Sequence, residues 1–305
     1  MQNIIDNAIE YGRRFIGNGR PASYIPELSK VNPNQLGVAV VEVSGSCWSS
    51  GDFDSSFTIQ SISKTIALLL AISDKGMDYV FEKVGMEPTG DAFNSIIKLE
   101  TIKTAKPLNP MINAGAIAVD SMIAGQSTDE KFTRLLEFFR MLCHNPEINY
   151  SNAVYLSEKT TGYRNRALAH FMKDSGVVEG EVEEVLDLYF RQCSIEVTCR
   201  DIAMLGAVLA SDGISPKTGE RLIPKSLARI VKTFMVTCGM YDASGEFAIK
   251  VGLPAKSGVG GGIMVAVPGK MGIGVFGPAL DEKGNSVGGI KVLEHISNEL
   301  NLSIF

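Results

Sequence analysis

The hydrophobic residues of this chain change their spacing twice, and this change constrains the fold more than any other feature of the sequence. Near the amino end, residues 36–43 and 47–53 predict two short strands around a Ser-Gly-Ser turn. Near the carboxyl end, residues 263–267 and 271–276 do the same around Pro-Gly-Lys. From about residue 61 to residue 232 the apolar spacing is helical. Strands at both ends of the chain therefore bracket a helical middle.

This arrangement predicts an α+β fold with one antiparallel sheet built from both chain ends. An opening helix is expected before the first strand, and the remaining helices are expected at residues 61–75, 114–124, 129–142, 152–173, 179–191, 200–211 and 285–300. The first and last helices should cover the sheet. Residues 1–60 and 233–305 would form a sheet lobe and residues 61–232 an inserted helical lobe, with the ligand site in the cleft between them.

Composition excludes several classes of protein. A chain of 305 residues that is 45% hydrophobic can bury roughly three quarters of its unfolded surface, so it is neither disordered nor a disulfide-stapled miniprotein. A net charge of -5 without long runs of one sign predicts no nucleic-acid partner. The longest apolar run, residues 66–72, is far shorter than the roughly 20 residues of a membrane-spanning helix. Charged residues interrupt residues 1–15, and we expect a cytoplasmic protein with no membrane partner.

The sequence predicts neither a metal site nor a cofactor. Its five cysteines contain no C-x-x-C pair, and its three histidines lie far apart, so we expect reduced, packed thiols and no zinc. Residues 272–277 match G-x-G-x-x-G, but Pro278 follows where a dinucleotide site needs a helix. We interpret this segment as a strand whose small residues face close packing.

The first group that could carry chemistry is Ser61, with Lys64 one turn later at the start of an apolar helix. A desolvated, neutral lysine can take the proton of a serine hydroxyl, and a helix amino terminus stabilises negative charge. The spacing is not specific, since Ser95 and Lys98 match it as well, and an N-cap serine is the structural alternative.

A serine acyl-transfer site of this kind also needs a Lys-Ser/Thr-Gly strand. Residues 217–219 match the pattern in a polar loop, whereas residues 256–258 lead into a glycine-rich segment and then an apolar strand. The context favours residues 256–258. For the additional polar group that such a site needs, residues 150–152, residues 211–213 and Tyr241 all compete, and spacing does not choose among them.

With these residues placed, the chain resembles the bacterial glutaminases of the serine-dependent, β-lactamase-like family, from about residue 24 to residue 289. The matching stretches are YIPEL at 24–28, QSISK at 60–64, NPMINAGA at 109–116, SEK at 157–159, RN at 164–165, YF at 189–190, CSIEVT at 193–198, CGMYD at 238–242, GLPAKSGV at 252–259 and GNS at 284–286. The resemblance implies a β-lactamase/DD-peptidase-like fold.

The resemblance also implies hydrolysis of L-glutamine to L-glutamate and ammonia through an acyl-enzyme on Ser61, without a cofactor or metal. Lys64 would activate the serine, Tyr241 would relay protons, and the backbone amides of Ser61 and Val259 would form the oxyanion hole. Glu158 would bind the substrate ammonium. The remaining substrate ligands implied by the resemblance are Tyr24, Gln60, Asn113, Asn165 and Tyr189. A homo-oligomer, dimer or tetramer, is expected.

Two other readings share the same scaffold. A serine β-lactamase or penicillin-binding enzyme uses the same S-x-x-K and K-S/T-G residues, but it would require export. A non-catalytic glutamine sensor would have no use for Ser61, Lys64 and Tyr241 together, which argues against that reading.

Overall fold

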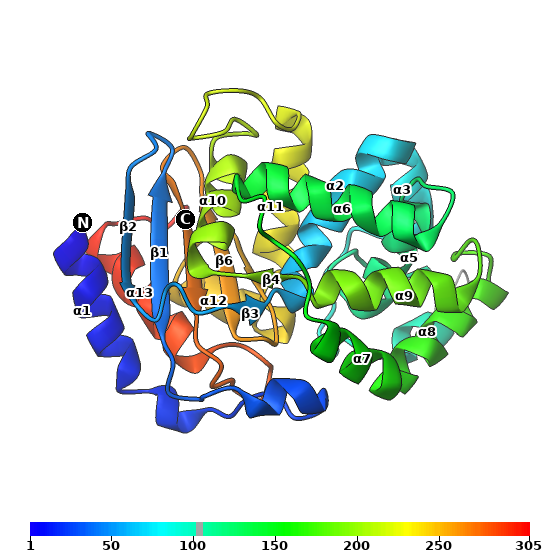
Figure 1. Cartoon of the computed structure of the whole chain (residues 1–305), viewed down its shortest axis with the longest axis horizontal. Coiled ribbons are helices and arrows are strands. Elements are labelled where there is room, and N and C mark those ends of the chain that lie inside the picture. The colour runs from blue at the N-terminus through cyan, green and yellow to red at the C-terminus, as the bar shows by residue number, and fades with distance from the viewer. Residues whose placement is uncertain (102–105) are drawn as a thin grey trace.

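The computed structural model describes residues 1–101 and 106–305 and contains one large antiparallel sheet (Figure 1). Its strands are β1 (Gly37–Glu42), β2 (Cys47–Gly51), β5 (Ala255–Ser257), β6 (Gly262–Val267) and β7 (Met271–Phe276). They lie in the order β2-β1-β7-β6-β5. In the central pair, Gly37 lies opposite Phe276 and Glu42 opposite Met271. The prediction that strands from the two chain ends pair in one sheet is confirmed.

Helices cover both faces of the sheet. On one face, α1 (Gln2–Arg13) and α13 (Val287–Glu299) pack against each other and against the strands, as expected. On the other face, α10 (Cys199–Ala210) lies across β1, β6 and β7. A Cβ atom at Gly274 would lie 2.2 Å from the Cys199 carbonyl oxygen. The predicted close packing of the small residues in this strand is therefore present, because α10 contacts them.

The other helices form a layer beside the sheet (Figure 1). They are α2 (Lys64–Lys75), α3 (Met77–Lys83), α4 (Ile97–Thr101), α5 (Asn113–Met122), α6 (Thr128–Cys143), α7 (Asn152–Thr161), α8 (Tyr163–Asp174), α9 (Val182–Cys193) and α11 (Lys225–Cys238). The short helix α12 (Ser244–Lys250) instead packs through Phe247 with buried residues of the sheet, α1 and α13. Helix α2 is buried from Lys64 to Ile72 and packs against α3, α5, α6 and α11. A pair of short strands, β3 (Phe57–Thr58) and β4 (Glu196–Val197), joins the segment before α2 to the segment after α9.

The structure differs from the expected elements in two respects. Residues 152–173 form two helices rather than one, and the break falls at Gly162. A Cβ atom there would lie 2.6 Å from the Phe190 ring, so α9 packs closely where the helix breaks. Helices α3, α4, α11 and α12 were not among the expected helices. The division into lobes stays a prediction, and α10, from the segment expected in the helical lobe, packs on the sheet.

Within residues 1–101 and 106–305, no helix combines the length and the apolar character that crossing a membrane requires.

Candidate active site

Ser61 lies in a tight turn at the amino end of the buried helix α2. Residues Gln60–Ser63 form a 3-10 turn that continues directly into α2. Gln60 adopts a left-handed backbone conformation with φ of 48°, which is uncommon for a residue with a side chain. The Ser63 hydroxyl donates to the Gln60 carbonyl at 2.7 Å and holds the turn closed. Ser61 is thus fixed at the helix terminus rather than on a mobile loop.

A glycine-rich segment after β5 lies directly against this turn. Cβ atoms at Gly258 and Gly260 would lie 2.5 Å and 2.3 Å from the carbonyl oxygens of Ile59 and Thr58. Only glycine permits so close an approach of two backbones. This packing brings the backbone of Val259 to the Ser61 turn, where the resemblance expects the second oxyanion amide.

Lys64 is 1% exposed and forms no ion pair with any carboxylate of the described chain. Its Nζ donates to Asn113 Oδ1 at 2.7 Å and to the Met111 carbonyl at 3.3 Å. Burial lowers the pKa of Lys64 to about 8, although Cys193, Glu158 and Asp120 act in the opposite direction. About a tenth of this amine is therefore neutral at pH 7, and the neutral form is the one that a base for serine requires.

Tyr241 lies beside Ser61 in a strained backbone conformation. Its φ is 55°, and such outliers cluster at functional sites. Burial raises the pKa of the phenol above its usual value, while the neighbouring Ser61 hydroxyl, the Val259 backbone and the Ser257 hydroxyl lower it in part. The Tyr241 hydroxyl has no hydrogen-bond partner among the described residues.

Amide side chains extend from Lys64 towards α8. Asn113, the first residue of α5, accepts from Lys64 and donates through Nδ2 to Asn165 Oδ1 at 3.0 Å. The backbone N–H of Asn113 donates to the Phe93 carbonyl at 2.9 Å. The Phe93 ring packs on Tyr241 with ring centroids 4.8 Å apart. Sequence reasoning missed Phe93, because it lies in an irregular segment whose only signal is a single aromatic residue.

Glu158 on α7 is the buried carboxylate of this group. Burial raises the pKa of Glu158 to about 8, against the opposing effects of Lys64 and the Gln60 amide. Its Oε2 has no hydrogen-bond partner in the described parts of the chain. An unpaired buried carboxylate is costly unless a cation joins it. A substrate ammonium would supply that charge.

Two tyrosines complete the group. Tyr189 on α9 is buried, and burial, Cys193 and Glu158 raise its pKa. The Tyr24 ring stays half-exposed. The pKa of its hydroxyl is raised, mainly because the hydroxyl is desolvated and further because Tyr241 and Glu158 lie nearby. The structure therefore brings together the residues expected at the site, from eight separate segments. It also places Cys193, which the sequence reasoning treated only as packing, among them.

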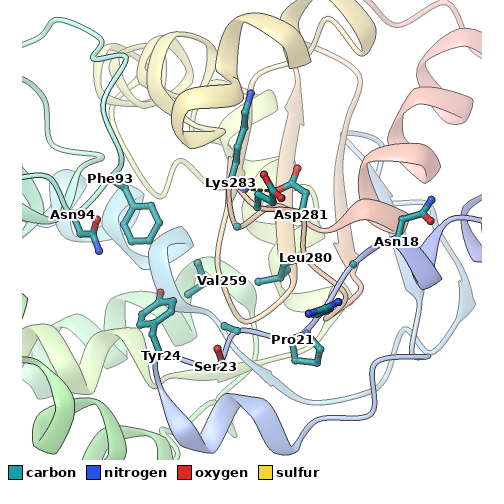
Figure 2. Close-up of a pocket in the computed structure, with 15 residues that line it drawn as sticks. Asn18, Pro21, Ser23, Tyr24, Phe93, Asn94, Val259, Leu280, Asp281 and Lys283 are labelled. Carbon is teal, nitrogen blue, oxygen red and sulfur yellow. Dashed lines mark hydrogen bonds between the residues drawn. The ribbon is translucent and has the colours of Figure 1, made fainter.

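A cleft of about 690 Å³ opens onto this group. Figure 2 shows Tyr24 on one side of the cleft, Phe93 and Asn94 on another, and Val259 between them. Asp281 and Lys283 line the outer part. Since Tyr24 and Val259 contact both the cleft and the buried residues, a small molecule can reach Ser61 from this side.

The structure places the favoured Lys-Ser-Gly match at the site and the alternative match in an exposed loop. Lys256 is fully buried and its Nζ lies 4.6 Å from the centre of the Tyr241 ring, whereas Lys217 is exposed in a loop. Asp212 pairs with Lys225 and Lys232. The side chain of Lys98, in the second Ser-x-x-Lys match, lies outside the described residues.

The antiparallel sheet flanked by helices and the buried Ser-x-x-Lys helix beside it are those of the β-lactamase-like fold. The family model for glutaminase matches residues 19–305. The chain is 59% identical over 305 residues to a glutaminase of Clostridium botulinum (strain Loch Maree / Type A3), covering 100% of both chains. The chain belongs to the glutaminase family.

Two solved structures support the same relationship. A probable glutaminase of Bacillus subtilis has a TM-score of 0.94 and 45% identity, with 100% of this chain and 97% of that chain covered. A Bacillus subtilis glutaminase in covalent complex with 5-oxo-L-norleucine, formed from 6-diazo-5-oxo-L-norleucine, has a TM-score of 0.92 and 43% identity, covering 100% and 99%.

Proposed function

We propose that this protein hydrolyses L-glutamine to L-glutamate and ammonia through an acyl-enzyme on Ser61. The observation that carries the proposal is the state of Lys64. It is fully buried one turn from Ser61, bonded to two oxygen acceptors and to no carboxylate of the described chain. Burial lowers the pKa of Lys64 to about 8, and a partly neutral amine one turn from a serine hydroxyl can serve as its base.

In the first half-reaction, neutral Lys64 takes the proton of the Ser61 hydroxyl, and Oγ attacks the side-chain amide carbon of glutamine. The backbone amides of Ser61 and Val259 stabilise the oxyanion that forms, which is typically worth 10²- to 10³-fold in rate for each donor. Tyr241 passes a proton to the amide nitrogen. The C–N bond then breaks, ammonia leaves, and the glutamyl group stays as an ester on Ser61.

In the second half-reaction, a water molecule attacks this ester and gives up a proton to the Lys64 and Tyr241 pair. The same amides hold the second oxyanion. The C–O bond to Ser61 breaks, Oγ recovers its proton, and L-glutamate leaves with the original protonation of the enzyme restored.

The charged ends of glutamine match the buried polar groups. Glu158 would receive the ammonium, because its Oε2 has no partner among the described residues and a buried charge gains most from an opposite one. The α-carboxylate and the side-chain amide of glutamine would bind the polar side chains that remain. These are the side chains of Tyr24, Gln60, Asn113, Asn165 and Tyr189.

The test is ammonia release from L-glutamine by wild type and Ser61→Ala, with L-asparagine and a chromogenic β-lactam as parallel substrates. Ser73→Ala is a matched control, since among the described residues that hydroxyl donates only to the Leu69 carbonyl within the same helix. We expect glutamine turnover in wild type and Ser73→Ala and none in Ser61→Ala. Turnover of the β-lactam alone, or binding of glutamine without turnover, would reject the proposal.

We also propose that the protein acts in the cytoplasm as a homodimer or homotetramer. All five cysteines are free, and four are buried, which suits a reducing compartment. Large apolar side chains on α7 and α8, Leu156 and Tyr163, are exposed and would gain from a partner surface. Sedimentation velocity at micromolar concentration measures this, and a monomer would contradict it.

A further inference from the structure

Asp120 is a buried carboxylate that the proposed reaction does not use. It lies on α5 about two turns beyond Asn113, and therefore on the same face of that helix. It is 0% exposed, and neither carboxylate oxygen has a hydrogen-bond partner among the described residues. Burial raises the pKa of Asp120 well above its usual value, while Lys64, the Gln192 amide and Lys131 favour the charged form. A buried polar group in this state calls for a partner.

Asp120 lines a cavity of about 60 Å³ near the amino ends of α6 and α9. The other lining residues are 125–128, Lys131, 179–181, Glu184, Val185 and Leu188. A water molecule takes up about 30 Å³ in the liquid, so the cavity has room for one small ion with a water but not for an organic ligand.

The charges around this cavity favour a cation. Glu179, Glu181 and Glu184 line it together with Asp120, and Lys131 is the single positive side chain among the lining residues. Glu179 is engaged by Lys83 at 2.7 Å and by Tyr79. Glu181 and Glu184 form no ion pair with described residues and leave the mouth negative.

We propose that this cavity binds a small monovalent cation, Na⁺, K⁺ or NH₄⁺, with the Asp120 carboxylate as its ligand. A divalent ion fits less well, because no group of three or more His, Cys, Asp or Glu side chains converges in the parts of the chain described. The nearby Lys131 makes binding weak, so we expect saturation at millimolar concentration or above.

A cation at Asp120 would act on the catalytic lysine. The charge of Asp120 favours the protonated form of Lys64, and a bound cation cancels that charge. The neutral, reactive form of Lys64 then becomes more populated. Because a pKa of about 8 leaves about a tenth of Lys64 neutral at pH 7, the effect on turnover at that pH is at most about tenfold. This consequence rests on the proposed function, whereas cation binding itself does not.

The test compares NaCl, KCl and NH₄Cl with choline chloride at one ionic strength, because choline is too large for the cavity. Thermal melting and glutamine turnover are measured for wild type and Asp120→Asn. We expect at least one small cation to raise the melting temperature of wild type by about 2 °C or more over choline. Asp120→Asn should lose that difference.

Glu179→Gln is the matched control. It removes the same charge from the same cavity, but at a residue already engaged by Lys83, so the cation response should persist. Equal melting of wild type in all four salts overturns the proposal without any variant, as does a cation response that survives in Asp120→Asn. If Asp120→Asn does not fold, Glu184→Gln takes its place and should weaken the response. A melting response without glutamine turnover would reject the proposed function and leave the cation site standing.

Discussion

The pH dependence of kcat/KM tests the electrostatics of the site most sharply. The reactive free enzyme needs Lys64 neutral and Glu158 charged, and the pKa of each group is about 8. Both protons must leave, so the rate rises with pH. Treated as independent groups, they are both in the reactive form in about 1% of molecules at pH 7 and about 80% at pH 9. We expect kcat/KM for glutamine to rise about 100-fold over that interval.

Glu158→Gln separates the two titrations. With only Lys64 left to titrate, the rise between pH 7 and pH 9 should fall to about tenfold or less, on a lower absolute rate. The midpoint should also move down, because the charge of Glu158 holds the pKa of Lys64 up. The assay is initial ammonia release at subsaturating glutamine, with circular dichroism confirming the fold at each pH. A flat wild-type profile from pH 6 to pH 8, or identical slopes in the two proteins, would refute the reasoning.

Three further substitutions test other parts of the account. Glu158→Gln should raise KM more than it lowers kcat, because an ammonium ligand acts in ground and transition states alike. Steady-state kinetics measures both constants, and a loss of kcat at an unchanged KM would contradict that role. Tyr241→Phe should lower kcat about 10²-fold or more with an unchanged melting temperature, since its hydroxyl has no partner in the described chain to leave unsatisfied; wild-type turnover would exclude the relay. Gly274→Ala should lower the free energy of unfolding in denaturant by about 3 kcal/mol or more, because the new methyl group meets the Cys199 carbonyl of α10. Gly245→Ala is the control, because a Cβ there meets nothing within 4 Å, and it should be neutral or slightly stabilising. An equal loss of unfolding free energy in the two variants would argue against close packing of Gly274 on α10.

The fold could be predicted where local pattern decides structure. Short strand-like segments around turn residues identified the strands at both chain ends, and these strands pair in one sheet. The break at Gly162 could not be predicted, because it depends on the Phe190 ring from α9. The same holds for α10, since nothing in its own sequence distinguishes packing on a sheet from packing on other helices.

The candidate site was predictable in two parts. Ser61 and Lys64 are one helical turn apart, so their proximity follows from sequence spacing alone. Glu158, Asn165 and Tyr189 lie on different helices, and only the family resemblance connected them to Ser61. Neither spacing nor the resemblance pointed to Phe93 or Asp120, whose surroundings are created by tertiary contacts of segments distant in the sequence.

The most direct test of the central claim is the intact mass of the protein after incubation with 6-diazo-5-oxo-L-norleucine. This reagent carries the amino-acid part of glutamine and a reactive diazo ketone in place of the amide. We predict one covalent adduct for each wild-type chain, located by peptide mapping at Ser61, and none in Ser61→Ala. An adduct on another residue, or equal labelling of Ser61→Ala, would contradict Ser61 as the nucleophile.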